Sequence, residues 1–467
     1  QTNGVLHSSL EFRQVLESAH ITKCLLPLHI SIRWPTGSHA NQAFINSNTY
    51  KLVYMHISIL GNGHEIGRSA FLVSDGKTKV MLDYGVKIQP EPPQYPIKAK
   101  TDAVILSHAH LDHSGAVPVL YGKAKPRAFM TDVTLDLSKM LLEDSLKVAQ
   151  KNGFNAPFVK NDIRKMVKGT NVVSYREKFR IGTFSCMLYD AGHIPGSASP
   201  LLKNHKTLFY TGDIQTTESN LLAGCKLPDS CDVLITESTY SYKSHPSREK
   251  EEKRLIDHVE EALSKEEKVL LPVFAAGRAQ EVLLILEKYA NKIALDGMAK
   301  KASDIVSKYS YHLKDKQRLK NILKKIHWVH GHESRIKAAQ HYPIIIATAG
   351  MLGGGPAIHY LREMKHRPES KVLFTGFLVE ESPGRNLLET KIFRTAEEKF
   401  HVHCHLDQFQ LSAHAGRPGL MHIIKKLNPE TVICIHGEKT KEFAKDIEKE
   451  FPSTQAIAPK NGDEIRL

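Results

Sequence analysis

Cysteine is scarce in this chain, and its six cysteines form no Cys-x-x-Cys pair and follow no regular spacing. Structural zinc sites and disulfide frameworks depend on such patterns, so we expect a reduced, cytoplasmic protein whose cysteines are small buried residues. No apolar run reaches the ~20 residues that a membrane-spanning helix needs, so we expect no membrane partner. The sequence also lacks short repeats and low-complexity tracts, which argues against a solenoid.

Negatively charged residues are fewer than positively charged ones. The chain has 50 Asp and Glu residues and 64 Lys and Arg residues, which gives a net charge of +14. A basic balance favours a polyanionic partner, and nucleic acid is the first candidate. An ordinary basic surface is the alternative. At 467 residues, with 41% hydrophobic and 24% charged residues, the chain has the composition of a globular protein of two or three domains.

The chain changes character at Met55. Residues 1–54 show no sustained period, so we expect an extension or a small accessory segment there. After Met55, short apolar runs alternate with helical patterns, which predicts an α/β architecture. Strands are predicted at residues 70–74, 80–82, 103–106, 184–189, 207–210, 233–236, 269–273, 344–347, 372–375 and 432–435. Helices are predicted at residues 133–150, 248–264, 278–289, 298–312 and 439–450.

One short segment concentrates potential metal ligands. Its sequence, His-Ala-His-Leu-Asp-His, brings together His108, His110, Asp112 and His113. Imidazole and carboxylate groups are the ligands that zinc takes in reactive sites. Four ligands this close do not suit one tetrahedral ion with a free position, so the spacing predicts two neighbouring ions, as in phosphodiester hydrolysis.

Acids and imidazoles also follow several predicted strands. They are Asp83, His108, Asp213, Glu237 and His436. In α/β folds, ligands and catalytic groups gather at the carboxyl ends of strands. Taken singly, each of these residues has an ordinary structural explanation. Taken together with the histidine-rich segment, they predict one site.

The predicted ligands divide into two sets that share one carboxylate. The first ion would take His108, His110, His193 and Asp213. The second ion would take Asp112, His113, Asp213 and His436. Asp213 would therefore lie between the two ions, which are ~3.5–4 Å apart in such sites.

These residues and their order resemble the metallo-β-lactamase fold, and three further segments resemble the motifs of its β-CASP group. The segments are Glu237–Tyr240, Ser412–Ala415 and Ile435–Glu438. Residues 61–69 and 272–281 also match, so the resemblance runs from Met55 to Leu467. The chain is most similar to the nuclease subunit of the cleavage and polyadenylation specificity factor and its archaeal homologues. The segment before Met55 shows no RNA-binding domain of the kind that archaeal relatives often carry.

The resemblance implies an α/β protein with a four-layer αβ/βα metallo-β-lactamase domain, interrupted by an α/β β-CASP cap domain. The expected parts are an N-terminal extension of unknown role at 1–54, the first part of the metallo-β-lactamase domain at 55–240, the β-CASP domain at 241–388 and the C-terminal return of the first domain at 389–467. Archaeal relatives often dimerise, so a homodimer is expected.

The resemblance also implies the activity. The expected enzyme is a ribonuclease that uses two Zn²⁺ ions to activate water and leaves a 5′-phosphate and a 3′-hydroxyl. Asp112, Glu237 and His414 are its expected catalytic residues, with His414 as the acid and Glu237 as its partner. Asp83 is expected to hold the ligand loops.

Several alternatives stay open at this point. Cleavage is expected to be mainly endonucleolytic, in mRNA 3′-end processing or RNA decay, with 5′–3′ exonuclease activity as an addition. The other classes are a DNA-acting β-CASP nuclease, a small-molecule metallo-hydrolase and a non-catalytic scaffold. His436 favours RNA, because DNA-acting members typically carry valine there.

The RNA contacts have weaker signals. The candidates are Arg278, Gly353, Gly354 and Ser412. The segment Gly350–Pro356 follows a predicted strand and precedes a helix that Pro356 would start, so its backbone amides are placed to meet a phosphate. A flexible loop without a ligand is the alternative, as is an ordinary surface arginine at position 278.

Overall fold

A computed structural model of the chain describes residues 54–89 and 92–467. The predicted extension, apart from its last residue, lies outside the described residues, and so does Cys24. Of the five cysteines that the structure describes, all are free and four are buried. None of the described helices combines the length and the apolarity that a bilayer crossing requires.

The first sheet has seven strands in the order β22-β1-β2-β3-β4-β5-β6. Their bounds are His56–Gly61 (β1), Ala70–Ser74 (β2), Lys79–Leu82 (β3), Ala103–Ile105 (β4), Arg127–Met130 (β5), Thr170–Val172 (β6) and Glu464–Arg466 (β22). The central strands β3, β4 and β5 run parallel, so their carboxyl ends lie at one edge.

The second sheet also has seven strands, in the order β21-β20-β11-β10-β9-β8-β7. Their bounds are Lys178–Ile181 (β7), Phe184–Asp190 (β8), Ala198–Lys203 (β9), Thr207–Tyr210 (β10), Val233–Glu237 (β11), Thr431–Ile435 (β20) and Gln455–Ile457 (β21). Strands β10, β11, β20 and β21 are parallel neighbours. The chain therefore returns to this sheet after residue 430, where β20 and β21 add to β11 at one side.

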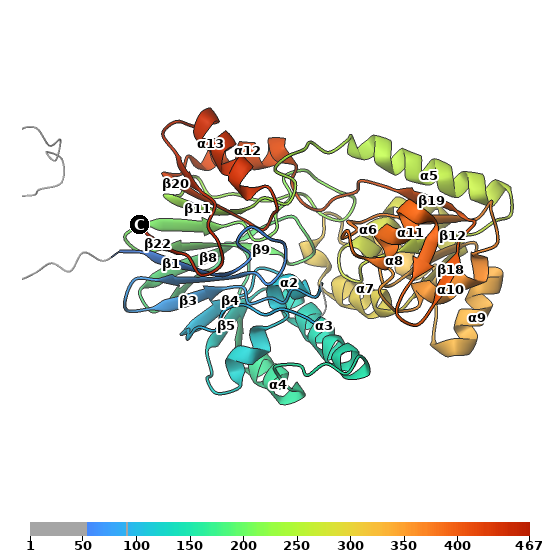
Figure 1. The fold of residues 1–467 in the computed structure, drawn as a ribbon, viewed down its shortest axis with the longest axis horizontal. Helices are drawn as coiled ribbons and strands as arrows, with labels where there is room; N and C mark the ends of the chain where they lie inside the picture. Colours follow the sequence, from blue (N-terminus) through green and yellow to red (C-terminus); the bar gives the residue numbers. More distant parts are fainter. Residues whose placement is uncertain (1–53, 90–91) are drawn as a thin grey trace, which may run out of the picture. The chain divides into compact units, whose positions relative to one another are not determined.

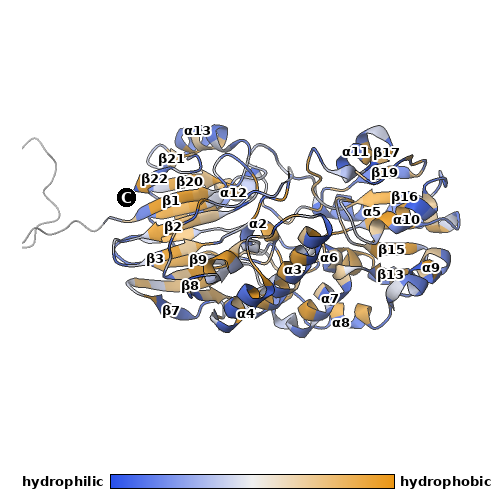
Figure 2. Ribbon diagram, turned by 60° about the horizontal axis from the view of Figure 1, so that its bottom comes forward, coloured by the Kyte–Doolittle hydropathy of each residue, from blue (hydrophilic) through white to orange (hydrophobic). Residues whose placement is uncertain are grey.

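The two sheets pack face to face over a core that takes apolar side chains from both, for example Phe71 and Ile105 from the first and Leu208 and Ile235 from the second. Figure 1 shows α3 (Asp132–Lys151) and α4 (Lys160–Lys168) on one outer side of this sandwich, with α12 (Arg417–Leu427) and α13 (Thr440–Glu450) on the other. The helices turn polar surface outward, whereas the strands are mostly apolar (Figure 2). The predicted four-layer arrangement is confirmed.

The third sheet has six parallel strands in the order β14-β13-β15-β12-β16-β19. Their bounds are Val269–Pro272 (β12), Ile293–Asp296 (β13), His327–Trp328 (β14), Ile344–Ala347 (β15), Lys371–Phe374 (β16) and His405–Gln408 (β19). A parallel sheet must be covered on both faces, and it is. One face carries α5 (Arg248–Ser264), α6 (Arg278–Ile285), α7 (Met298–Lys308) and α8 (Arg318–Leu323). The other carries α9 (Gly331–His341), α10 (Ala357–Met364), α11 (Pro383–Thr390) and the small sheet of β17 (Ile392–Arg394) and β18 (Lys399–His401).

The cap and the sandwich share one apolar core. Ile194 and Leu222 of the sandwich belong to the same buried cluster as Leu271 and Val282 of the cap. Polar contacts add to it, since His312 Nε2 lies 2.9 Å from Asp132 Oδ1 at the start of α3. The cap is therefore packed against the sandwich rather than tethered to it.

Two predicted helices are shorter than expected. The helix predicted at 278–289 ends at Ile285 and is followed by a 3₁₀ turn, Glu287–Lys292. The one predicted at 298–312 ends at Lys308 and is followed by the 3₁₀ turn Ser310–His312. Strand β19 joins the third sheet beside β16, after residue 388, where the cap was expected to end. We propose that the cap extends to Gln408, and the boundaries at residues 54 and 240 stay predictions.

Candidate active site

The site lies where parallel strands of the two sandwich sheets end. Asp83 follows β3, Asp213 follows β10 after two residues, Glu237 is the last residue of β11, and His436 follows β20. The fifth residue, His108, comes shortly after β4 and just before the short helix α2 (Leu111–Ser114). The structure therefore brings the polar strand ends together as the sequence predicts.

The first predicted ligand set converges on one point. His108 Nε2 and His193 Nε2 each lie 3.5 Å from Asp213 Oδ2. His110 Nδ1 lies 3.2 Å from His108 Nε2 and 3.1 Å from His193 Nε2. Three ring nitrogens and one carboxylate oxygen thus face each other in a small, largely buried space.

The second predicted set converges beside it, on the other oxygen of the same carboxylate. His113 Nε2 lies 3.2 Å from Asp213 Oδ1, and His436 Nδ1 lies 3.7 Å from that atom. Asp112 Oδ2 lies 3.3 Å from His436 Nε2 and 3.8 Å from His113 Nε2. Each oxygen of Asp213 therefore faces a different set of ligands.

The spacing of these atoms fits zinc. Ligand atoms that share a tetrahedral zinc ion at ~2.0–2.2 Å lie about 3.3–3.6 Å from one another. The measured separations in the first set, between 3.1 and 3.5 Å, match that range closely. Asp213 Oδ1 is buried and accepts no hydrogen bond within the described part of the chain. A buried carboxylate oxygen without a donor is costly unless a cation satisfies it.

Charge in the site also favours a cation. Burial opposes ionisation of Asp213, but the surrounding histidines outweigh it and hold the pKa of Asp213 well below its usual value. Burial also lowers the pKa values of His108 and His193 well below normal, which leaves neutral rings. Metal ions bind ionised carboxylates and neutral imidazoles, so the protonation states of these three residues suit metal binding. Burial also disfavours the charged ring of His113, but the carboxylates around it outweigh burial and raise the pKa of His113 well above its usual value.

Asp83 acts through His113 rather than as a member of either set. Its Oδ2 accepts hydrogen bonds of 2.7 Å from His113 Nδ1, Ser107 Oγ and Tyr210 OH. Its Oδ1 accepts one from the Ser107 N–H. Asp83 is fully buried, and its backbone has φ 58°. This left-handed conformation costs about 1 kcal/mol or more for a residue other than glycine, and such strain clusters at functional sites.

We expect Asp83→Asn to weaken zinc binding about 10–100-fold, because the amide cannot accept all four hydrogen bonds and His113 loses its orientation. The measurement is a zinc affinity from chelator competition. Asp102→Asn is the matched control, since Asp102 is an exposed acid at the opposite end of the β3–β4 pair. Equal zinc affinities in the two variants would contradict this role.

His414 and Glu237 form a pair beside the ligand sets. His414 Nδ1 lies 3.1 and 3.0 Å from the two carboxylate oxygens of Glu237, and its Nε2 lies 3.9 Å from Asp213 Oδ2. Glu237 is fully buried and also accepts the Ile214 N–H at 2.8 Å. Burial disfavours the charged ring, but Glu237 and Asp213 outweigh it and raise the pKa of His414 to about 9. A protonated Nε2 therefore faces the site at neutral pH.

The four residues predicted to contact RNA have different structural surroundings. Ser412 Oγ accepts the His414 N–H at 3.0 Å, so it positions the histidine loop. Arg278 opens α6, next to the site. Gly353 and Gly354 lie in the loop between β15 and α10, where an added Cβ would meet nothing within 4 Å. Contact with RNA stays a prediction for all four.

Two supporting residues were not predicted from the sequence. Thr239 Oγ1 lies 2.9 Å from His436 Nδ1, and Gln215 Nε2 donates to the backbone oxygens of Ser412 and His414 at 3.2 and 2.9 Å. Each stands two residues after a predicted site residue, Glu237 or Asp213. That position is the sequence signal for Gln215, whereas Thr239 also lies within the motif-like segment Glu237–Tyr240.

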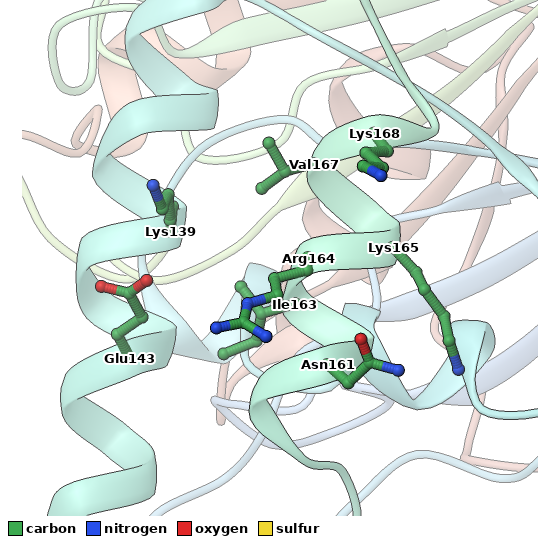
Figure 3. A pocket seen from close by; sticks show the side chains of 8 residues that line it. All are labelled: Lys139, Glu143, Asn161, Ile163, Arg164, Lys165, Val167 and Lys168. Atoms are coloured by element: carbon green, nitrogen blue, oxygen red, sulfur yellow. The ribbon is translucent and has the colours of Figure 1, made fainter.

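A separate surface hollow lies between α3 and α4, and its charged side chains are drawn in Figure 3. Its lining residues are Lys139, Glu143, Asn161, Ile163, Arg164, Lys165, Val167 and Lys168. The hollow is basic, in line with the net charge, but it contains none of the predicted site residues. We assign it no part in the chemistry.

Three protein-family models match parts of this chain. The Beta-Casp domain matches residues 279–387, and the Zn-dependent metallo-hydrolase RNA specificity domain matches residues 399–459. The Anti-Pycsar protein Apyc1 family matches residues 55–246. The first two fall on the cap and on the C-terminal return that carries His414 and His436.

Relatives cover most of the chain. A protein named probable RNase MJ4, from Methanocaldococcus jannaschii, is 38% identical over 88% of this chain and 100% of its own length. RNase aCSPSF2 from Saccharolobus solfataricus is 33% identical over 88% of this chain and 85% of its own length. Transcription termination factor FttA from M. jannaschii is 33% identical over 89% and 72%.

Together with the fold and the site, these matches define the class: the chain belongs to the β-CASP group of metallo-β-lactamase nucleases. The resemblance seen in the sequence is confirmed. Among solved structures, a protein of unknown function from Enterococcus faecalis V583 has a TM-score of 0.54 at 16% identity. It covers 89% of this chain and all of its own, and it supports the fold alone.

Proposed function

We propose that this chain is a ribonuclease that binds two Zn²⁺ ions and hydrolyses phosphodiester bonds of RNA, mainly within the strand. The observation that carries this proposal is Asp213, whose two oxygens face two separate sets of ligand atoms at 3.2–3.7 Å. Two metal ions side by side suit in-line displacement at phosphorus. RNA is supported as substrate by relatives whose names are those of RNases.

The residues have separate tasks in this proposal. One ion would be held by His108, His110, His193 and Asp213, and the other by Asp112, His113, Asp213 and His436. Bound zinc would supply activation of water and neutralisation of charge on the phosphoryl oxygens. His414 would donate its Nε2 proton to the leaving 3′ oxygen, while Glu237 holds the ring by Nδ1. The products would be a 3′-hydroxyl and a 5′-phosphate.

The proposal is tested by metal analysis and substrate choice together. Purified protein should contain two zinc ions per chain and should cut an end-labelled single-stranded RNA into internal fragments that carry 5′-phosphates. Removal of zinc with a chelator should abolish cutting, because water then loses its activation, and added zinc should restore it.

Matched DNA and a thioester are the comparison substrates in that experiment. Cleavage of the thioester alone would reject a nuclease, and preference for DNA would favour the DNA-acting alternative. Stepwise release of single nucleotides from a 5′-monophosphate RNA would make the enzyme an exonuclease instead. A homodimer and a cytoplasmic location stay predictions.

A further inference from the structure

Exposed aromatic side chains gather beside the site. Phe274, Phe377 and Tyr242 expose 36, 42 and 57% of their surface. In the described residues only two other aromatic side chains are as exposed, Tyr54 and Tyr311. Several large apolar side chains that are exposed together usually mark a binding site.

The two phenylalanines stand at one edge of the third sheet. Phe274 comes two residues after β12 and Phe377 three residues after β16, and these strands are parallel neighbours. Two glycines lie against the Phe274 ring and backbone. A Cβ at Gly376 would lie 3.1 Å from Phe274 Cε2, and one at Gly350 would lie 3.0 Å from the Phe274 N atom. The Phe274 ring therefore lies next to the backbone at Gly376, where the Cβ atom of any other residue would be tightly packed against the ring.

Tyr240 connects this edge to the catalytic pair. Its ring centroid lies 6.4 Å from that of Phe377 and 6.1 Å from that of His414. Lys243 Nζ lies 4.8 Å from the ring centroid of Tyr240 and 5.8 Å from that of Tyr242. The buried Tyr240 ring therefore links the acid of the site to the exposed Phe377 of the cap, with the Lys243 cation beside it.

Arg278 adds a second cation at the same place. It opens α6 four residues after Phe274. Within the described residues no carboxylate lies within 4 Å of its guanidinium group, whereas the neighbouring Arg248 is paired with Glu252 and Glu281. A phosphate is a fitting partner for an unpaired guanidinium group.

We propose that Phe274 and Phe377 form a stacking subsite for unpaired bases of the RNA that flank the cleaved phosphate. This inference rests on the proposed function and adds two residues that would contact the bases of its substrate. Aromatic rings and cations alternate in surfaces that bind single-stranded nucleic acid, where rings stack on bases and cations follow the phosphates. Bases in a duplex are already stacked on each other and offer no free face, so a duplex would lose these contacts.

Phe377→Leu tests the subsite in the zinc-loaded protein. We expect KM for a single-stranded RNA to rise about 5–20-fold with little change in kcat, because leucine lacks a ring face. Phe377→Trp should restore the KM. Zinc content and hydrolysis of bis-p-nitrophenyl phosphate, which has no base, should equal those of the unchanged protein. Ile336→Ala is the control, an exposed apolar side chain on α9.

RNAs with single abasic positions near the cut identify the stacked base. The unchanged protein should show a raised KM for one such RNA, and Phe377→Leu should show no further rise with it, since the two changes remove the same contact. Equal KM values for Phe377→Leu and the unchanged protein would overturn the subsite while leaving the nuclease intact. A loss in Phe377→Trp as large as in Phe377→Leu would also overturn it, by showing a packing role. A zinc-loaded protein that cuts no RNA would reject the proposed function itself.

Discussion

Asp213→Asn is expected to reduce RNA cleavage at least about 1,000-fold and to lower the zinc content from two ions per chain to one or none. Asp213 is 2% exposed, and each of its oxygens faces one ligand set. Asparagine has nearly the same shape but carries no charge and only one acceptor oxygen. It can therefore complete one set at most.

The measurements are zinc per chain by elemental analysis and single-turnover cleavage of labelled RNA. Asp229→Asn is the matched control, because Asp229 is an exposed acid between β10 and β11. Circular dichroism should show the same fold in both variants. Retention of both zinc ions and of the cleavage rate in Asp213→Asn would end the two-metal proposal.

His414→Ala should slow RNA cleavage about 100–10,000-fold, the usual worth of a general acid, while the zinc content stays close to two. The expected loss follows from the pairing of His414 Nδ1 with Glu237 at 3.0 Å, which leaves Nε2 to carry the proton. Glu237→Gln should give a smaller loss, because the ring stays in place but its charge is less well stabilised.

A substrate with a good leaving group separates acid catalysis from other roles. A p-nitrophenyl phosphodiester needs no proton on its leaving oxygen, so His414→Ala should cleave it at close to the normal rate. His422→Ala is the control for a lost histidine, since His422 is exposed on α12. An equal loss with both substrates, or a fall in zinc content, would make His414 a metal ligand instead.

Much of the sandwich and of the cap could be predicted, because the central strands of their sheets are apolar runs. The runs at 207–210 and 344–347 became β10 and β15 with the same bounds, and the helix at 248–264 became α5. Some short strands were not predicted. β13, Ile293–Asp296, has four buried residues but follows a helical segment without a clear break, so its period is too brief to detect.

The ligand sets could be predicted from the sequence for a different reason. Four of the ligands lie in one short segment, His436 follows an apolar strand directly, and Asp213 follows one after two residues. The supporting contacts were out of reach, because the Ala413 backbone oxygen that accepts from His193 Nδ1 at 2.9 Å is 220 residues away in the chain. Such pairs exist only after the sheets are assembled.

The aromatic edge shows the same limit. Phe274 lies in a recognisable segment, yet a phenylalanine after a buried strand is most often itself buried. Two glycines that follow other strands, Gly350 and Gly376, lie against Phe274 and leave its ring next to backbone. The sequence contains those glycines but does not say which ring they face.

The late pairing of β20 with β11 in the second sheet has a consequence for how the protein is made. Its neighbour β11 ends at Glu237, and β20 ends at Ile435, so the intervening two hundred or so residues must leave the ribosome before the strand can pair. Until β20 has been made, the nascent polypeptide also lacks His436, which follows that strand. The two ligand sets can therefore be completed only after the whole segment between β11 and β20 has been synthesised.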